Sequence, residues 1–289
     1  MSSLNIMIFV LEDNENLFSP FMHDLPNLLN KSNNIPINIM YYSRHLFGSQ
    51  IISISKDTYV SKKVPNIKDE YKTIKSKIEE LYNSCYVKGK QNILYFGGHS
   101  LSIFKDNRRL HTNIFENISG LELLIFDSCY TSYTTLLSTV INKTKYVLGC
   151  ETSSPYVGYL SEQFLQILNT KLTNKTKYKK IIDAYIERNN NTDDVDKKLN
   201  YRTDGTLIDM TRYVDLYEYI KDQEFIKDKK CKVEKNVGYY FYDLSCVGKN
   251  KEIDDLIKGC VIYQKMSKSC KEHFKTRKIV LSGMLVSII

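Results

Sequence analysis

Asn92-Ile-Leu-Tyr-Phe-Gly-Gly-His99 and Leu121-Glu-Leu-Leu-Ile-Phe-Asp-Ser-Cys129 are two apolar runs, each ending in small and polar residues. Short continuous apolar runs of this kind are typical of strands that are buried on both faces in a parallel sheet. The polar residues then mark the loops that leave the carboxyl ends of the two strands. If the strands are neighbours, about 4.8 Å apart, His99 and Cys129 meet at one edge of the sheet. In open α/β sheets this edge is where ligands bind.

The rest of the chain predicts an α/β fold around these two strands. Apolar runs predict further strands at residues 5–11, 37–42 and 145–149, with a small hairpin at 51–61. Helical spacing of apolar residues predicts helices at 68–86, 134–141, 159–172 and 178–187, and an irregular helix at 16–30, where two prolines intervene. Strands that alternate with helices predict a mostly parallel central sheet flanked by helices. The polar stretch 189–198 is the expected flexible insertion.

The alternation of predicted strands and helices becomes less clear after Asp222, which we take as the end of the core. Residues 1–222 are predicted to form this core, and residues 223–289 a C-terminal extension that packs on it. The extension is expected to contain a strand at 238–244, a helix at 251–266 and a final strand within 280–288.

Composition limits the classes of protein and partner. The 289 residues carry a net charge of +8, but the Lys-rich stretches are interrupted by Asn, Tyr and acids, so neither a nucleic acid nor a membrane is expected as partner. No segment is long and apolar enough to cross a bilayer, and the start lacks the features of a signal peptide. The seven cysteines include no Cys-x-x-Cys pair. We therefore expect reduced thiols, no zinc cluster and a cytoplasmic location.

His99 and Cys129 are a pair suited to nucleophilic catalysis. A cysteine attacks a carbonyl as its thiolate, and a nearby imidazole can accept the proton and return it to the leaving amine. The backbone N–H groups of Ser100 and Cys129, in the two loops, could hold the developing oxyanion. The sequence therefore predicts a Cys-His dyad with these two oxyanion donors, and leaves the other histidines structural.

The two motifs resemble the His and Asp-x-Cys motifs of the caspase-like cysteine peptidases, a group that includes caspases, metacaspases, legumains, gingipains and clostripain. Further segments resemble the clostripain family in the family's order. They are Met7-Ile-Phe-Val-Leu-Glu-Asp-Asn-Glu-Asn-Leu17, Gly149-Cys-Glu-Thr-Ser-Ser-Pro-Tyr-Val-Gly-Tyr159, Thr203-Asp-Gly-Thr-Leu-Ile-Asp-Met210 and Leu281-Ser-Gly-Met-Leu-Val-Ser-Ile288. The resemblance spans almost the whole chain. It implies a caspase-like three-layer sandwich with a small C-terminal extension, and a cysteine endopeptidase.

The same resemblance implies which residues bind substrate. The aspartate two residues before the nucleophile, Asp127, matches the residue that lines a pocket for Arg or Lys at P1, the residue before the scissile bond. Alternation along a strand would place its carboxylate on the same side as Cys129, and a guanidinium would pair with it better than an ammonium. Alternatively, Asp127 caps the loop through backbone N–H groups. Cys150 and Glu151, in the family-like stretch after the next strand, are the other substrate-binding candidates.

Two departures from the family pattern leave alternatives open. Ser100 stands where the family has Gly, and its β-carbon could narrow the oxyanion pocket or strain the turn. Tyr159 replaces a Trp. A catalytically inactive caspase-like interaction module is therefore one alternative. A metacaspase-like peptidase is another, because Asp127-Ser-Cys-Tyr-Thr-Ser132 is similar to the metacaspase nucleophile segment.

The remaining expectations concern cofactors, processing and assembly. No cofactor or metal is expected; the resemblance allows calcium dependence, but the acidic stretch at 193–196 lacks the ligand spacing of a calcium loop. Self-cleavage, as in many relatives, would use Lys105, Arg108 or Arg109. Peptides or proteins with a basic P1 residue are the expected partners. The chain is expected to be monomeric, and to act in host cytoplasm if the AT-rich coding implied by its Lys, Asn and Ile content is viral.

Overall fold

The computed structural model describes residues 4–12, 35–43, 48–55, 58–67, 71–98, 113–152, 158–191, 202–236 and 239–288. For 105–106, 109–110, 234–236, 239 and 287–288 it describes the backbone alone. The predicted helix at 16–30 and most of the polar stretch 189–198 lie outside these residues.

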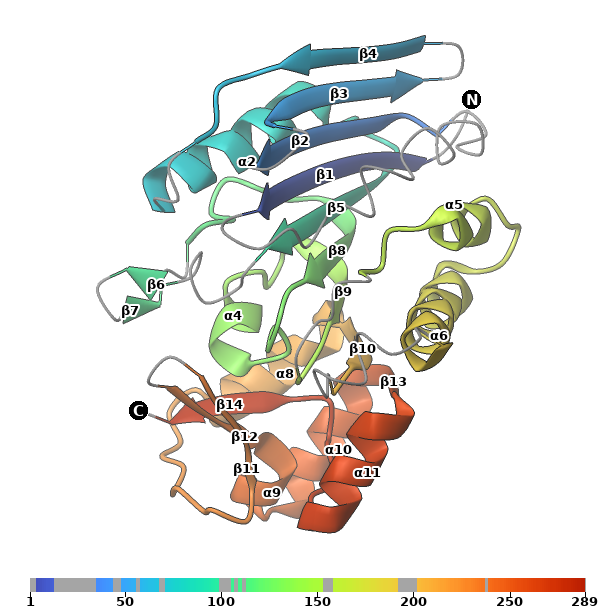
Figure 1. Ribbon diagram of the computed structural model, residues 1–289. Coiled ribbons are helices and arrows are strands. Elements are labelled where there is room, and N and C mark those ends of the chain that lie inside the picture. The colour runs from blue at the N-terminus through green and yellow to red at the C-terminus, as the bar shows by residue number, and fades with distance from the viewer. Residues whose placement is uncertain are drawn as a thin grey trace.

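A nine-stranded sheet forms the centre of the molecule (Figure 1). Its order is β13-β10-β9-β8-β5-β1-β2-β3-β4. The five central strands run parallel to one another: β9 (Thr144–Gly149), β8 (Leu121–Asp127), β5 (Gln91–Gly98), β1 (Leu4–Glu12) and β2 (Ile37–Ser43). Antiparallel strands extend both sides: β3 (Gln50–Ser55) and β4 (Thr58–Lys63) beyond β2, and β10 (Asp204–Asp209) and β13 (Val261–Met266) beyond β9. The predicted α/β class and mostly parallel sheet are confirmed.

Helices cover both faces of this sheet, and each face has its own apolar cluster. Helices α2 (Tyr71–Cys85), α4 (Thr134–Ser138), α8 (Met210–Ile220) and α10 (Lys251–Cys260) pack on one face. Helices α5 (Glu162–Leu168) and α6 (Asn174–Asn191) cover the other (Figure 1). On α2 the predicted apolar side chains Ile74, Ile78 and Leu81 are buried. The result is a three-layer sandwich.

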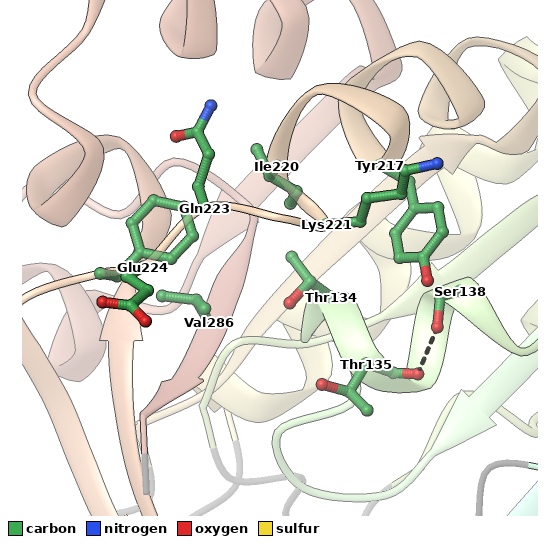
Figure 2. Close-up of a pocket in the computed structure, with 10 residues that line it drawn as sticks. Thr134, Thr135, Ser138, Tyr217, Ile220, Lys221, Gln223, Glu224 and Val286 are labelled. Carbon is green, nitrogen blue, oxygen red and sulfur yellow. Dashed lines mark hydrogen bonds between the residues drawn. The ribbon is translucent and has the colours of Figure 1, made fainter.

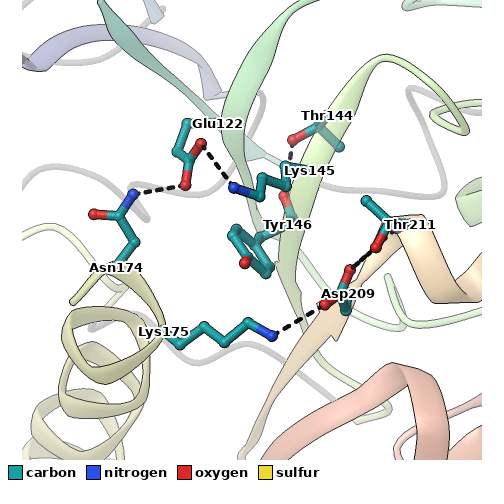
Figure 3. A network of polar contacts seen from close by, with 8 residues as sticks. All are labelled: Glu122, Thr144, Lys145, Tyr146, Asn174, Lys175, Asp209 and Thr211. Atoms are coloured by element: carbon teal, nitrogen blue, oxygen red, sulfur yellow. Dashed lines mark hydrogen bonds and ion pairs between the residues drawn. The ribbon is translucent and has the colours of Figure 1, made fainter.

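A polar network fixes α6 at the amino-terminal ends of β8 and β9 (Figure 3). Asn174 donates to Glu122 at 2.6 Å, and Lys145 lies 3.9 Å from the same carboxylate. Lys175 forms an ion pair with Asp209 at 3.3 Å. Since the candidate motifs lie at the carboxyl ends of the parallel strands, this network holds the opposite edge of the sheet.

The C-terminal residues form a second, three-stranded antiparallel sheet and also contribute to the first. The small sheet has the order β11-β12-β14, from Lys232–Asn236, Tyr239–Asp243 and Leu285–Ile288. Short helices α9 (Leu244–Gly248) and α11 (Lys268–Arg277) complete this part of the chain. The β6–β7 ladder (Lys105–Asp106 and Arg109–Leu110) stands apart from both sheets.

The predicted helix at 251–266 is wrong in its second half. Helix α10 ends at Cys260, and Val261, already extended with φ −79° and ψ 99°, begins β13. Val261, Ile262 and Tyr263 favour strands because their side chains pack well on a pleated surface. β13 pairs with β10, so residues beyond 222 complete the central sheet. The domain boundary at 222 stays a prediction.

The expectation of reduced thiols fails for one pair. Cys231 and Cys246 form a disulfide that closes the β11–β12 hairpin, with their Cα atoms 5.4 Å apart. The two cysteines are 15 residues apart, so the sequence held no short-range motif for the bond. Disulfides persist mainly in oxidising compartments, and the cytoplasmic location, which rested partly on reduced thiols, stays a prediction. In the part of the chain that the structure describes, no helix is long and apolar enough to span a membrane.

Candidate active site

The two motif strands lie side by side and end at the same edge. β5 and β8 pair in parallel, with Gly97 opposite Asp127. Gly98, the last residue of β5, has φ +150°, which L side chains rarely adopt, and this explains a glycine before the turn. His99 and Ser100 follow directly and lie outside the described residues.

A hydrogen bond joins the residues that precede His99 and Cys129. The Ser128 hydroxyl donates to the Gly98 carbonyl, and Ser128 is buried. Consequently the two chain segments are tied together one residue before each member of the predicted dyad. Cys129 itself is half-buried, forms no disulfide, and packs against the cluster on the α2 and α4 face.

The loop after the nucleophile is held against the end of β9. Tyr130 N–H donates to the Thr152 carbonyl and Ser132 N–H to the Cys150 carbonyl, each at 2.9 Å. The Cys150 amide donates to the Thr131 hydroxyl at 3.1 Å. Residues 130–132 therefore run along the 150–152 backbone.

Cys150 and Glu151 are buried rather than open to substrate. Their exposed fractions are 2% and 0%. The Cys150 thiol donates to the carbonyls of Ser128 and Thr152, both at 3.1 Å, and burial raises its pKa well above the ordinary value, so it stays a neutral donor. These side chains have no surface to offer a substrate, which does not fit their expected substrate-binding role; their visible role is to support the loop.

Asp127 is also buried, with its carboxylate on the α5 and α6 face. Its Oδ2 accepts from the Tyr95 hydroxyl and from Tyr159 N–H, the latter at 2.9 Å. A β-carbon on Gly158 would overlap this oxygen, so Gly158 permits the close approach of the 158–159 backbone. β8 ends at Asp127, so the strand alternation that we expected to align its carboxylate with Cys129 does not extend to the nucleophile.

Three buried carboxyl groups, those of Glu151, Asp204 and Asp243, lie near the end of β9, and of these partners only Asp204 belongs to a segment that the sequence resemblance had singled out. Asp204, in the family-like segment 203–210, accepts from the amides of Glu151 and Thr152 at 2.9 to 3.1 Å. Glu151 accepts at Oε2 from Gln264 at 2.7 Å and from Gly283 N–H at 2.9 Å. Asp243 and Gln264 carried no motif that could have singled them out.

Burial makes this cluster take up protons on folding. Burial, reinforced by Asp243 and Asp204, raises the pKa of Glu151 well above its usual range, and burial raises the pKa of Asp243 to about 6. Among the described residues no His, Cys, Asp and Glu side chains form a group suited to a metal ion. Backbone amides and the side chains of Thr152 and Gln264 already bond to Asp204 and to Oε2 of Glu151. The acidic stretch 193–196 lies outside the described residues.

We predict that the cluster makes the folded state less stable as pH rises. Unfolded carboxyl groups release their protons near pH 4, whereas the folded cluster keeps a proton to higher pH, so the folded state binds more protons and the free energy of unfolding falls from pH 4 through about 6 and above. Urea unfolding between pH 4.5 and 8 measures this. Glu151→Gln, which keeps the acceptor for Gly283 but cannot ionise, should make the decline shallower; an unchanged slope would contradict the assignment. Glu122→Gln, on the surface network, is the matched control.

A cavity of about 570 Å³ lies behind α4 and holds none of the candidate catalytic residues (Figure 2). Its lining includes Thr134, Ser138, Tyr217, Lys221, Phe225 and Val286. Side chains from α4, from α8 and the residues that follow it, and from β14 thus line it.

The β6–β7 ladder carries the predicted processing residues. The structure describes only the backbone at Lys105 and Arg109, and Arg108 lies outside the described residues. Self-cleavage in this segment stays a prediction.

Comparison with known proteins finds the same fold in cysteine proteases. No family model and no curated protein matches the sequence. The X-ray structure of a secreted C11 cysteine protease from Bacteroides thetaiotaomicron, iotapain, matches with TM-score 0.69 and 13% identity over 99% of this chain and 93% of that chain. A secreted C11 protease from the same species, in complex with an irreversible peptide inhibitor, matches with TM-score 0.71 and 13% identity over 100% and 93%.

An inactive zymogen C11 protease from Parabacteroides distasonis matches with TM-score 0.67 and 11% identity over 100% of this chain and 92% of that chain. All three matches extend over essentially the whole chain, C-terminal extension included. The chain therefore has the caspase-like fold of the clostripain-like C11 proteases, which confirms the fold implied by the sequence resemblance.

Proposed function

We propose that this protein is a clostripain-like cysteine endopeptidase in which Cys129 is the nucleophile and His99 the acid and base. The observation that carries the proposal is the Ser128–Gly98 hydrogen bond, which joins the two motif segments one residue before each member of the dyad. The fold of the C11 cysteine proteases supports it.

In the proposed reaction the Cys129 thiol passes its proton to His99, and the resulting thiolate attacks the scissile carbonyl carbon. The carbonyl oxygen becomes an oxyanion, for which Ser100 and Cys129 N–H groups are the proposed donors, an interaction worth about 3–4 kcal/mol in related chemistry. The tetrahedral intermediate collapses, the C–N bond breaks and His99 protonates the leaving amine. Water then adds to the thioester with His99 as base, releasing the carboxylic acid and the free thiol.

For substrate class we propose Arg, then Lys, at P1, with Asp127 as the recognising carboxylate. The position of Asp127 supports this proposal, because its buried carboxylate lies at the end of β8, the strand that leads to the nucleophile. Its hydrogen bonds with Tyr95 and Tyr159 also support the alternative, in which Asp127 holds the loop. The two roles predict different effects of Asp127→Asn on the preference for a basic P1 residue.

Labelling with acyloxymethyl ketone peptides tests the peptidase function. We expect a probe with Arg or Lys at P1 to add one mass equivalent to intact protein, on Cys129, at a rate well above that of a probe with Asp at P1. Preincubation with a basic peptide substrate should slow the labelling. If folded protein takes up no probe of any P1 type at Cys129, the peptidase proposal is lost, and an inactive interaction module with the same fold becomes the better explanation.

The monomeric state and the cytoplasmic location stay predictions. Sedimentation of the purified chain tests the first. For the second, the redox state of Cys231 and Cys246 in cells is the useful measurement, because a reduced pair is what a cytoplasmic location requires.

A further inference from the structure

The residue after the nucleophile, Tyr130, has a backbone conformation that its type disfavours. Its φ is +57°, in the left-handed region, where bulky residues are rare. Such a conformation costs about 1–3 kcal/mol and persists only where the surroundings impose it. Tyr130 directly follows Cys129. The contacts that impose this conformation therefore also determine the direction of the chain at the nucleophile, just after β8 ends.

A backbone hydrogen bond and a ring contact help to hold Tyr130 in place. Its N–H donates to the Thr152 carbonyl at 2.9 Å. Its ring stacks on Phe241 of β12, with ring centroids 5.2 Å apart and planes 10° apart. Phe241 also meets Tyr133 edge-on, at 5.7 Å and 63°. One side chain of the C-terminal extension therefore contacts both ends of the loop that follows Cys129.

The small C-terminal sheet is joined to this loop through the backbone as well. Leu285 N–H donates to the Ser132 carbonyl at 2.8 Å, and Tyr133 forms a bridge with Leu285. Phe241 is 1% exposed and lies on the central strand of that sheet. The Cys231–Cys246 disulfide brackets the same hairpin, and Asp243 N–H donates to the Cys231 carbonyl at 3.0 Å. Phe241 is thus presented from a rigid support.

We propose that Phe241 is a positioning residue for the reaction: by stacking on Tyr130 it holds the left-handed turn that places the Cys129 thiol. This inference rests on the proposed peptidase function for its kinetic consequence, and on geometry alone for its effect on the thiol. It assigns the C-terminal extension a part in the site through the Tyr130 ring. Displacing a reacting atom by about 1 Å can cost about 100-fold in rate, so loss of the stack should act on turnover rather than on substrate binding.

The test compares Phe241→Leu with Phe274→Leu in the full chain. Phe274 is a similarly buried phenylalanine of the C-terminal extension, on α11, where it packs against His273. We expect Phe241→Leu to lower kcat by about 10- to 100-fold with KM within about twofold, and Phe274→Leu to lower thermal stability with kcat unchanged. Equal kcat in the two variants would overturn the proposal. If Phe241→Leu fails to fold, Phe241→Met, which retains volume but has no ring face, takes its place.

A double-mutant cycle separates positioning from general destabilisation. Tyr130→Leu and Phe241→Leu should each lower kcat, and the double variant should be no worse than either single one, because both remove the same contact. Additive losses would refute the coupling.

Alkylation of Cys129 by iodoacetamide, followed from pH 5 to 9 by mass spectrometry, does not need peptide cleavage. We expect the pH profile of Phe241→Leu to shift relative to wild type, and that of Phe274→Leu to stay in place. If wild type cleaves no peptide but the shift is present, the proposed function fails and the positioning role stands. If wild type cleaves peptides and the profiles coincide, the positioning role fails alone.

Discussion

Replacing Cys129 with alanine is expected to lower the rate of peptide hydrolysis by at least about 10⁴-fold, to the level of binding and oxyanion stabilisation without a nucleophile. The thiol is the only side chain in the proposed mechanism that forms a bond to substrate carbon, so its removal leaves the reaction without a protein nucleophile. The half-buried Sγ packs at the edge of a large apolar cluster, and losing it should change the free energy of unfolding by no more than about 1 kcal/mol. Fluorogenic peptides with Arg at P1, together with urea unfolding, measure both quantities.

Cys85→Ala is the matched control for this substitution. Cys85 is also a half-buried thiol outside any disulfide, but it lies at the end of α2 beside Asn5, at the amino-terminal ends of the parallel strands and so at the opposite edge of the sheet from the two motifs. Its removal should leave hydrolysis and probe labelling unchanged. A Cys129→Ala protein that retains more than about 1% of the activity would show that another residue is the nucleophile, and the assignment of the dyad would then be wrong.

The centre of the sheet was predictable because its signals are local. β1, β2, β5, β8 and β9 are continuous apolar runs that end in polar loops, so the sequence alone indicates both the strands and the edge at which they finish. β10 and β13 are different, because their pairing joins residues about 60 positions apart and fixes an antiparallel register that no short motif encodes. The 251–266 segment shows this directly: its helical spacing holds only to Cys260.

The candidate site divides in the same way. The dyad motifs and Asp127 follow from strand ends, and could be placed at one edge from the sequence. The burial of Cys150 and Glu151 could not, because it depends on Gln264 and Gly283, which lie 113 and 132 residues further along the chain. Cys150 and Glu151, which the family resemblance singled out, are therefore buried supporting residues of the loops around the candidate site. Gln264 and Gly283 of the C-terminal extension supply hydrogen bonds to Glu151.

Substituting Asp127 with asparagine is the second large effect that we expect. If Asp127 recognises a basic P1 residue, the variant presents an uncharged amide to a desolvated cation, and leaving such a charge unpaired costs about 2–5 kcal/mol. We predict a fall of at least about 30-fold in kcat/KM for P1 Arg and Lys, since about 1.4 kcal/mol corresponds to tenfold. Cleavage after an uncharged P1 residue should change little. The amide oxygen can still accept from Tyr159 N–H, so the 158–159 backbone keeps its contact.

Glu12→Gln provides the control that separates recognition from support. Glu12 is a carboxylate buried at the end of β1, at the same edge of the sheet, and it accepts from the Tyr41 and Ser43 hydroxyls much as Asp127 accepts from Tyr95 and Tyr159. Both substitutions replace a buried carboxyl group by an amide and alter its hydrogen bonds, so both should change unfolding by urea. Only Asp127→Asn should change the ratio of kcat/KM between P1 Arg and an uncharged P1 residue, while iodoacetamide still reaches Cys129. If Asp127→Asn lowers stability but leaves this ratio unchanged, the carboxylate serves the Tyr159 loop alone, and basic specificity must come from another group.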